Sequence, residues 1–208
     1  MNMTKKAAKL INGGLSNTSK MACKSYGLPA KECTTGSKLR KIEGSVCSDC
    51  YALKGMYFFP VVQAAQYKRL ASITSPEWVE SMVASIGKDL FFRWHDSGDI
   101  QTVDHLRKIC AVAEGTPSIK HWLPTRETGI LKEFKETGGA IPSNLIIRLS
   151  ATMVNGAPGK SHEHSSTVHT KDAPPIGEVC YASKQGGQCL DCRSCWNSDI
   201  RNISYEKH

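Results

Sequence analysis

The sequence lacks a long apolar run. No stretch approaches the roughly 20 residues of a membrane-spanning helix, and the apolar residues between Lys5 and Ile11 are too few for the hydrophobic segment of a signal peptide. An internal repeat of fixed period is also absent. We therefore expect no membrane association and a location in the cytoplasm, where thiols stay reduced.

The chain has enough apolar residues to form a hydrophobic core without the support of disulfides. The 208 residues, 40% of them apolar, fit a single domain over residues 1–208. Nine cysteines are a high and odd number for a cytosolic chain. This count favours metal ligation over a disulfide framework.

The net charge of +8 is concentrated near the start of the chain. Residues 1–60 hold ten Lys or Arg and three Asp or Glu, a balance of +7. A basic segment of this kind can follow a phosphate backbone. The same residues include four cysteines, whose thiolates around a metal cluster would also need positive charge nearby. Nucleic-acid binding and charge balance of a cluster both stay open.

The middle of the chain alternates between strand and helix patterns. We expect helices over residues 61–73 and from Ser75 and Pro76 onward, strands over 90–95, 120–123 and 144–149, and helices over 102–115 and 130–137. This order predicts an α/β fold, a partial β/α barrel or an open parallel sheet, with loop-rich, cysteine-bearing ends.

The two ends of the chain are expected to differ from these β/α units, which span residues 61–150. Residues 1–60 are predicted to form a loop-rich, basic segment that carries cysteines, without regular secondary structure over 1–45. Residues 151–208 read as a long loop over 151–175 followed by a cysteine cluster.

The C-terminal cysteines give the most specific signal. Cys180, Cys189, Cys192 and Cys195 include two successive C-x-x-C steps, which let one short loop wrap a compact iron–sulfur cluster. Zinc is the alternative, but zinc sites usually use two separated C-x-x-C pairs. The spacing favours iron and sulfide.

The N-terminal cysteines are less specific. Cys23, Cys33, Cys47 and Cys50 contain one C-x-x-C pair and suit either a zinc site or a cluster. Cys110 lies on the apolar stripe of an expected helix and is interpreted as a small buried hydrophobic residue.

Polar residues follow three of the expected strands, where ligands gather in parallel α/β folds. By alternation, Arg93 and His95 share one face of their strand, as do Arg148 and Ser150. Charged side chains on a buried strand need partners, so they pair with one another or receive an anionic ligand such as a carboxylate. The candidate cofactor-binding residues are Arg93, His95, Asp96, Asp99, Arg126, Glu127 and Arg148. No catalytic residue is assigned.

Several separate motifs resemble the gene product 88 family of phage proteins. They are CSDCYALKGMY at 47–57, RWHDSGDI at 93–100, WLPTRE at 122–127 and CRSCW at 192–196, and they spread over nearly the whole chain. The resemblance implies a phage origin, and so the cytoplasm of a host cell, and a metal cluster without specifying a reaction.

More distantly, a cysteine group followed by an aromatic residue and alanine, ahead of β/α units, resembles the radical S-adenosylmethionine enzymes. These hold a [4Fe-4S] cluster by three cysteines in a partial β/α barrel. The resemblance implies Cys33, Cys47 and Cys50 as ligands, residues 96–99 near the methionine amino group, and Arg148 near its carboxylate. The family's C-x3-C-x2-C spacing is absent, and Cys23 as a fourth ligand would leave no iron open to S-adenosylmethionine.

The sequence thus predicts a protein with one or two [4Fe-4S] clusters, of radical S-adenosylmethionine type if it is an enzyme. The alternative is a non-catalytic module, stabilised by iron–sulfur or zinc, that binds nucleic acid or a host protein through the basic residues 1–60. Salt-dependent affinity for nucleic acid without cofactor binding would distinguish the module from the enzyme.

Overall fold

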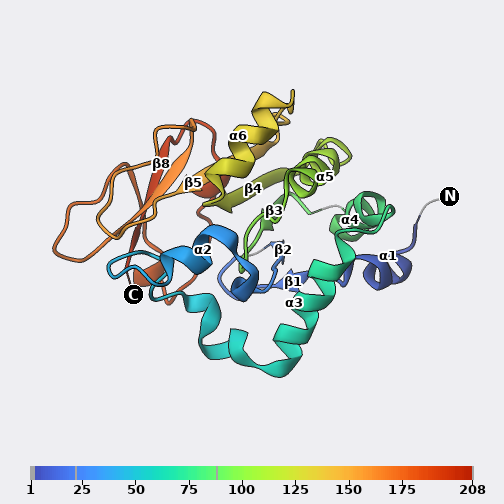
Figure 1. The fold of residues 1–208 in the computed structure, drawn as a ribbon, viewed down its shortest axis with the longest axis horizontal. Helices are drawn as coiled ribbons and strands as arrows, with labels where there is room; N and C mark the ends of the chain where they lie inside the picture. Colours follow the sequence, from blue (N-terminus) through green and yellow to red (C-terminus); the bar gives the residue numbers. More distant parts are fainter. Residues whose placement is uncertain (1–2, 22, 88, 208) are drawn as a thin grey trace.

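A computed structural model describes residues 3–21, 23–87 and 89–207. Its strands form one sheet in the order β1-β2-β3-β4-β5-β6-β8-β7 (Figure 1). The pair β1 and β2 is antiparallel, and the other pairs are parallel. The strands are β1 Ser16–Asn17, β2 Lys24–Tyr26, β3 Phe91–Trp94, β4 Lys120–Thr125, β5 Leu145–Ser150, β6 Ser165–His169, β7 Glu178–Cys180 and β8 Asn202–Glu206.

The helices precede, follow and connect these strands. They are α1 Lys5–Asn12, α2 Thr34–Leu39, α3 Pro60–Ser72, α4 Trp78–Ile86, α5 Val103–Glu114 and α6 Thr128–Glu136, with short 3₁₀ turns at Ala30–Glu32, Tyr51–Leu53, Gly55–Phe58, Ala182–Lys184 and Ser194–Trp196. From β2 to β6 the spatial order of strands follows the chain order, and the sheet does not close into a barrel. The predicted α/β class is confirmed. None of these described helices is long and apolar enough to cross a membrane.

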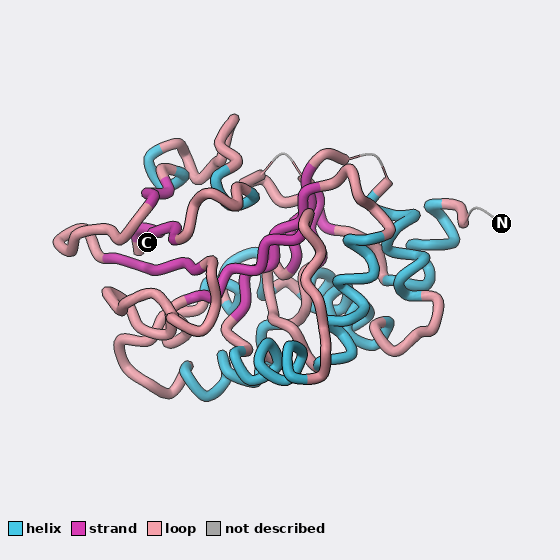
Figure 2. The backbone as a smooth tube through the Cα atoms, turned by 90° about the horizontal axis from the view of Figure 1, so that it is seen from above, coloured by secondary structure: helices cyan, strands magenta, loops and turns pink. Residues whose placement is uncertain are grey.

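One face of the sheet is covered by α4, α5 and α6, and we call it the helix face; Figure 2 shows the long helices gathered on one side of the strands. Its core contains Phe92, Trp94 and Ile147 from the strands, packed with Trp78 of α4 and Leu106 of α5, all without exposed surface. Alternation along the strands directs these apolar side chains to the same side.

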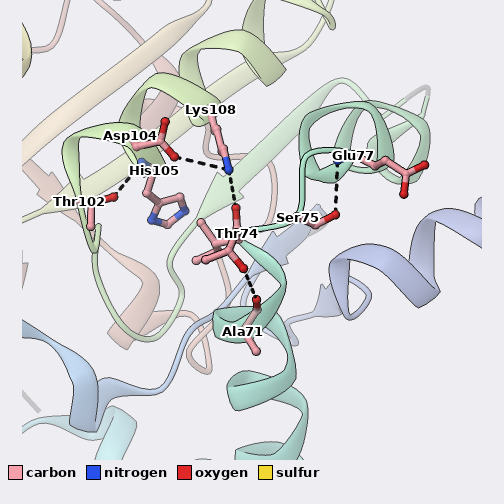
Figure 3. Close-up of polar contacts among 9 residues, drawn as sticks. Ala71, Thr74, Ser75, Glu77, Thr102, Asp104, His105 and Lys108 are labelled. Carbon is pink, nitrogen blue, oxygen red and sulfur yellow. Dashed lines mark hydrogen bonds and ion pairs between the residues drawn. The ribbon is translucent and has the colours of Figure 1, made fainter.

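The start of α5 follows directly from its sequence. The Thr102 hydroxyl accepts a hydrogen bond from the backbone N–H of His105 at 3.0 Å, as the expected N-cap (Figure 3). Asp104 in the first turn faces the positive end of the helix dipole and pairs with Lys108 at 3.4 Å. Gly115 ends the helix, also as predicted.

The opposite face, which we call the cysteine face, carries Arg93, Trp122 and Arg148. The segment that contains Cys189, Cys192 and Cys195 packs on it, because the Trp196 indole N–H donates to the carbonyl of Phe92 at 2.9 Å. Met21, Trp122 and Trp196 form a small apolar cluster separate from the main core.

Both chain ends are more regular than predicted. Residues 1–45, expected to be irregular, contain α1, β1, β2 and α2. Residues 151–175, expected to be one long loop, contain β6, which pairs with β5 and β8. Pairing with neighbouring strands orders β1, β2 and β6, whose side chains show no apolar alternation. The start of α1 has a local signal, because the hydroxyl of Thr4 accepts a hydrogen bond from the N–H of Ala7 at 3.2 Å.

Candidate metal and cofactor site

Three cysteines gather beyond the carboxyl ends of the parallel strands, and we call Cys33, Cys47 and Cys50 the edge cysteines. Cys33 precedes α2, and Cys50 precedes the turn Tyr51–Leu53. A Cβ at Gly36 would lie 3.7 Å from the Sγ atoms of both Cys33 and Cys47. It would also lie 2.9 Å from the Cβ of Cys33, so the glycine lets α2 pack directly against these two cysteines.

The electrostatics of the edge cysteines follow from their neighbours. Burial raises the pKa of the Cys33 thiol, and the negative charges of Asp99 and of the other two edge cysteines raise it further. Burial also raises the pKa of Cys47, which the guanidinium of Arg126 opposes. A cation bound among these thiols would reverse this effect by stabilising thiolates.

The carboxylates at the strand ends have partners within the protein. Asp99 accepts hydrogen bonds from the Thr125 hydroxyl at 2.6 Å and from the N–H groups of Arg126 at 2.9 Å and Ile100 at 2.8 Å. Burial raises the pKa of its carboxyl to about 6, against these hydrogen bonds. Asp99 thus organises the turn after β4 beside the edge cysteines.

Glu127 anchors the helix that follows Cys33. Its two carboxylate oxygens accept hydrogen bonds from the N–H of Thr35 at 2.8 Å and from the Thr35 hydroxyl at 2.7 Å. Arg126 donates from Nε to the carbonyl of Ala151 at 3.2 Å. Glu127 therefore fixes the start of α2 next to Cys33, and Arg126 connects the turn after β4 to the residue after β5.

Asp96 connects β3 to the segment after Cys50. Its carboxylate accepts hydrogen bonds from Ser25 at 2.7 Å and Tyr57 at 3.0 Å, and its carbonyl accepts one from Tyr51. Sequence reasoning did not assign a role to Tyr51 or Tyr57. The position of Tyr51 directly after Cys50 was the available signal.

His95 departs from its prediction. Its φ of 50° breaks the alternation of β3, so His95 does not share a face with Arg93. Its ring instead lies 5.5 Å from that of His105 on the helix face, and burial holds its pKa well below the usual value. A ligand on the cysteine face would not meet this histidine.

Arg148 also departs from its predicted role. Fully buried, it donates hydrogen bonds to the carbonyls of Cys195 at 3.0 Å and Ile200 at 2.8 Å, and to those of Ser194 and Asn197 at 3.2 and 2.8 Å. Four bonds to the backbone occupy its guanidinium. Arg148 therefore holds the C-terminal cysteine segment on the sheet, and it is not placed to receive a carboxylate.

Arg93, on the cysteine face, forms no ion pair with a carboxylate among the described residues. Its guanidinium lies 4.7 Å from the centre of the Trp122 ring and 3.5 Å from the Tyr51 hydroxyl. Its Nε is buried without a hydrogen-bond partner. Of the three predicted cofactor-binding arginines, Arg93 and Arg126 are the two whose guanidinium groups are not fully occupied by hydrogen bonds among the described residues.

A second group of thiols lies on the cysteine face, and we call its five members the face cysteines: Cys23, Cys180, Cys189, Cys192 and Cys195. Cys180 in β7 is paired in register with Tyr205 of β8, whose hydroxyl lies 3.4 Å from the Sγ of Cys195. The N–H of Cys192 donates to the carbonyl of Cys189 at 2.9 Å, which forms a tight turn. Burial raises the pKa of Cys195 to about 12.

The sequence placed Cys23 in the N-terminal set, and its position in the fold differs. Cys23 packs with Cys189 and Cys195 on the Met21, Trp122 and Trp196 cluster. It precedes β2, whereas Cys33 follows that strand. The N-terminal set is thus divided between the two groups.

No described cysteine forms a disulfide. Cys110 is 5% exposed in the main core, which confirms that it packs as a small hydrophobic residue. Within residues 3–21, 23–87 and 89–207, no three cysteine, histidine or carboxylate side chains converge closely enough to hold a single metal ion.

The comparisons with known proteins identify a family. The family model described as "Gene product 88" matches residues 1–198. The chain belongs to the gene product 88 family of phage proteins. No curated protein and no solved structure matches the chain.

Proposed function

We propose that this gene product 88 protein binds one or two [4Fe-4S] clusters through the edge cysteines and the face cysteines. The observation that supports this is the gathering of eight cysteines from distant segments into two groups, while Cys110 alone packs in the apolar core. Thiolates are the ligands of such clusters, which carry out one-electron transfer when bound. The residues around them hold the thiols in place: Glu127 through Thr35, and Arg148 through the backbone next to Cys195.

Zinc is the alternative metal. A tetrahedral zinc site needs four ligands that converge closely, with each sulfur about 2.3 Å from the ion. The described thiols do not converge in this way. A cluster of several iron and sulfide ions spans a wider gap between thiolates, and so it suits the spread of these cysteines better.

Anaerobic purification with analysis of iron, sulfide and zinc tests the proposal. We expect iron and sulfide in comparable amounts and broad visible absorption, which zinc does not give. Cys195→Ser should lower the iron content and destabilise the C-terminal segment, because cluster binding is coupled to folding. The matched control Cys110→Ser should retain iron. Stoichiometric zinc without sulfide would contradict the proposal.

The edge cysteines support a more specific, enzymatic function of radical S-adenosylmethionine type. Three thiols gather there, and Cys23, the candidate for a fourth, belongs to the face cysteines. A cluster held by three thiolates has one iron open to a further ligand. Because Asp99 and Arg148 are bonded within the protein, Arg93 and Arg126 are the side chains left for the amino-acid end of the cofactor.

Adding S-adenosylmethionine to the reduced protein tests this function. We expect a changed electron paramagnetic resonance signal and release of methionine and 5′-deoxyadenosine. An added reductant supplies the electron that cleaves the sulfur–carbon bond, and the buffer or the reductant supplies the hydrogen atom that completes 5′-deoxyadenosine. Cys50→Ala should abolish both, while Cys195→Ala should leave the signal change. If the electron paramagnetic resonance spectrum of the iron-loaded protein does not change when S-adenosylmethionine is added, the enzymatic function is contradicted. The proposal of cluster binding would not be affected.

The non-catalytic module remains the second candidate. Lys5, Lys6 and Lys9 lie exposed on α1 and support contact with nucleic acid or a host protein in the host cytoplasm. Binding to a DNA or RNA duplex should then weaken steeply with salt. Replacing the three lysines with Gln should remove that dependence, and affinity insensitive to salt would contradict the module.

A further inference from the structure

The N-terminal segment before β2 is bound to the C-terminal cysteine segment. The backbone N–H of Cys189 donates to the carbonyl of Lys20 at 2.8 Å. Met21 packs against Trp122 and Trp196, and Cys23 packs on the same cluster. Two parts of the chain that are about 170 residues apart therefore meet, and Cys23 and Cys189 pack on the same apolar cluster.

The position of Cys23 is fixed by the sheet. Lys24, its neighbour, pairs with Phe92 of β3, and the carbonyl of Phe92 accepts the indole N–H of Trp196. Trp196 directly follows Cys195. Cys23 and Cys195 thus each precede a residue that contacts Phe92, Lys24 through strand pairing and Trp196 through its side-chain hydrogen bond.

The charges around Cys23 suit a thiolate ligand. Two guanidinium groups lie nearby: Arg93 is 3.9 Å from the Sδ of Met21, and Arg193 lines the same cleft as Met21 and Cys23. Arg193 lies 5.4 Å from the centre of the Phe91 ring, at the rim of a cleft of about 470 Å³ that Cys23 also lines. Two cations beside a group of thiolates offset their charge.

From this arrangement we infer that Cys23 is a ligand of the C-terminal metal site, together with Cys189 and Cys195, and not of the N-terminal one. This inference rests on the proposed function. The site then joins the two ends of the chain across the cysteine face. The edge cysteines are left as a set of three.

Thiol alkylation read out by peptide mass spectrometry tests the inference. The test protein carries Ser in place of Cys33, Cys47 and Cys50, so any iron it holds belongs to the face cysteines. Ligation removes the free thiolate that reacts with iodoacetamide, so Cys23 should be alkylated roughly tenfold more slowly in the loaded protein than after anaerobic chelation. Cys110 serves as the internal control, slow in both states because it is buried.

A matched variant keeps the edge cysteines and replaces Cys180, Cys189, Cys192 and Cys195 with Ser. In it, loading with iron should not protect Cys23. Should either variant misfold, the single replacements Cys189→Ser and Cys50→Ser make the same comparison: the first should expose Cys23 to alkylation, and the second should leave it protected.

The outcomes separate this inference from the proposed function. A loaded protein in which Cys23 reacts as fast as after chelation would overturn the inference and leave cluster binding intact. Protection of Cys23 that persists after iron is removed would also overturn it, because burial alone would then explain the slow reaction. Absence of iron from the unmodified protein would overturn both.

Discussion

The two faces of the sheet are held by different kinds of contact. On the helix face, Phe92, Trp94 and Ile147 are buried against helices through apolar packing. On the cysteine face, Arg148 holds the C-terminal segment through backbone carbonyls, and the apolar contact there is limited to a few side chains around Trp196. Apolar packing stabilises a fold without any ligand, whereas hydrogen bonds exchanged with water contribute little net free energy. The helix face should therefore determine global stability, and the cysteine face should depend on what its thiols bind.

Trp94→Ala should cause the largest loss of stability, because it opens a cavity in the centre of the helix face. The Trp94 ring lies 4.9 Å from Phe92 and 6.0 Å from Trp78, centre to centre. We expect a loss of about 3–5 kcal/mol in the free energy of unfolding, measured by urea denaturation.

Trp94→Phe is the matched control. The indole N–H of Trp94 has no hydrogen-bond partner among the described residues, so removing it leaves no partner unsatisfied. Phenylalanine should cost less than about 2 kcal/mol. Equal losses for the two variants would show that the helix face does not depend on this packing.

Acidification should weaken the helix face through its buried histidines. Burial lowers the pKa of His105 to about 3 and that of His121 to about 4, from an ordinary value of 6.5. At a pH between each folded-state pKa and 6.5, the histidine is protonated in the unfolded chain and neutral in the folded one. The free energy of unfolding therefore falls as pH decreases below about 6.5. Burial also holds the pKa of His95 well below its usual value, so each of three histidines contributes a slope of about 1.4 kcal/mol per pH unit. Asp99, whose carboxyl pKa is raised to about 6, has the opposite sign and offsets part of this slope.

Denaturation at pH 6 and pH 5 measures this slope. His121→Phe should reduce the slope by about 1.4 kcal/mol per pH unit. It also removes the hydrogen bond between His121 and Thr116. A slope unchanged by that substitution would contradict the assignment of the acid sensitivity to these histidines.

Arg148→Met should affect the cysteine face with a smaller global effect. The substitution leaves four carbonyls of residues 194–200 without their donor, yet these can regain water if the segment detaches. We expect about 2 kcal/mol in the free energy of unfolding, lower iron content and faster proteolysis within residues 189–200. A loss in the free energy of unfolding as large as that of Trp94→Ala would show that the two faces contribute equally to global stability.

The sequence allowed the helix face to be predicted and the cysteine face only in part. The start of α5 at Thr102 and its end at Gly115 were readable because capping and apolar spacing are local properties. The left-handed turn at His95 and the pairing of the Ser- and Thr-rich β6 depend on neighbouring strands, which no local pattern encodes. Cys23 was assigned with its neighbours in sequence because the short strand β2, which carries the chain across the sheet, was not recognised.

Thr102→Ala gives the smallest expected effect and tests whether local helix signals matter on the helix face. The hydroxyl satisfies one N–H that the first turn of α5 would otherwise leave without a partner, and Figure 3 shows it directed at the start of that turn. Alanine should cost about 1 kcal/mol in the free energy of unfolding, and Thr102→Ser, which keeps the acceptor, only a few tenths. Neither variant should change iron content, because α5 packs on the face opposite the thiols. Loss of iron in Thr102→Ala alone would show that the two faces are coupled through β3 and are not separable.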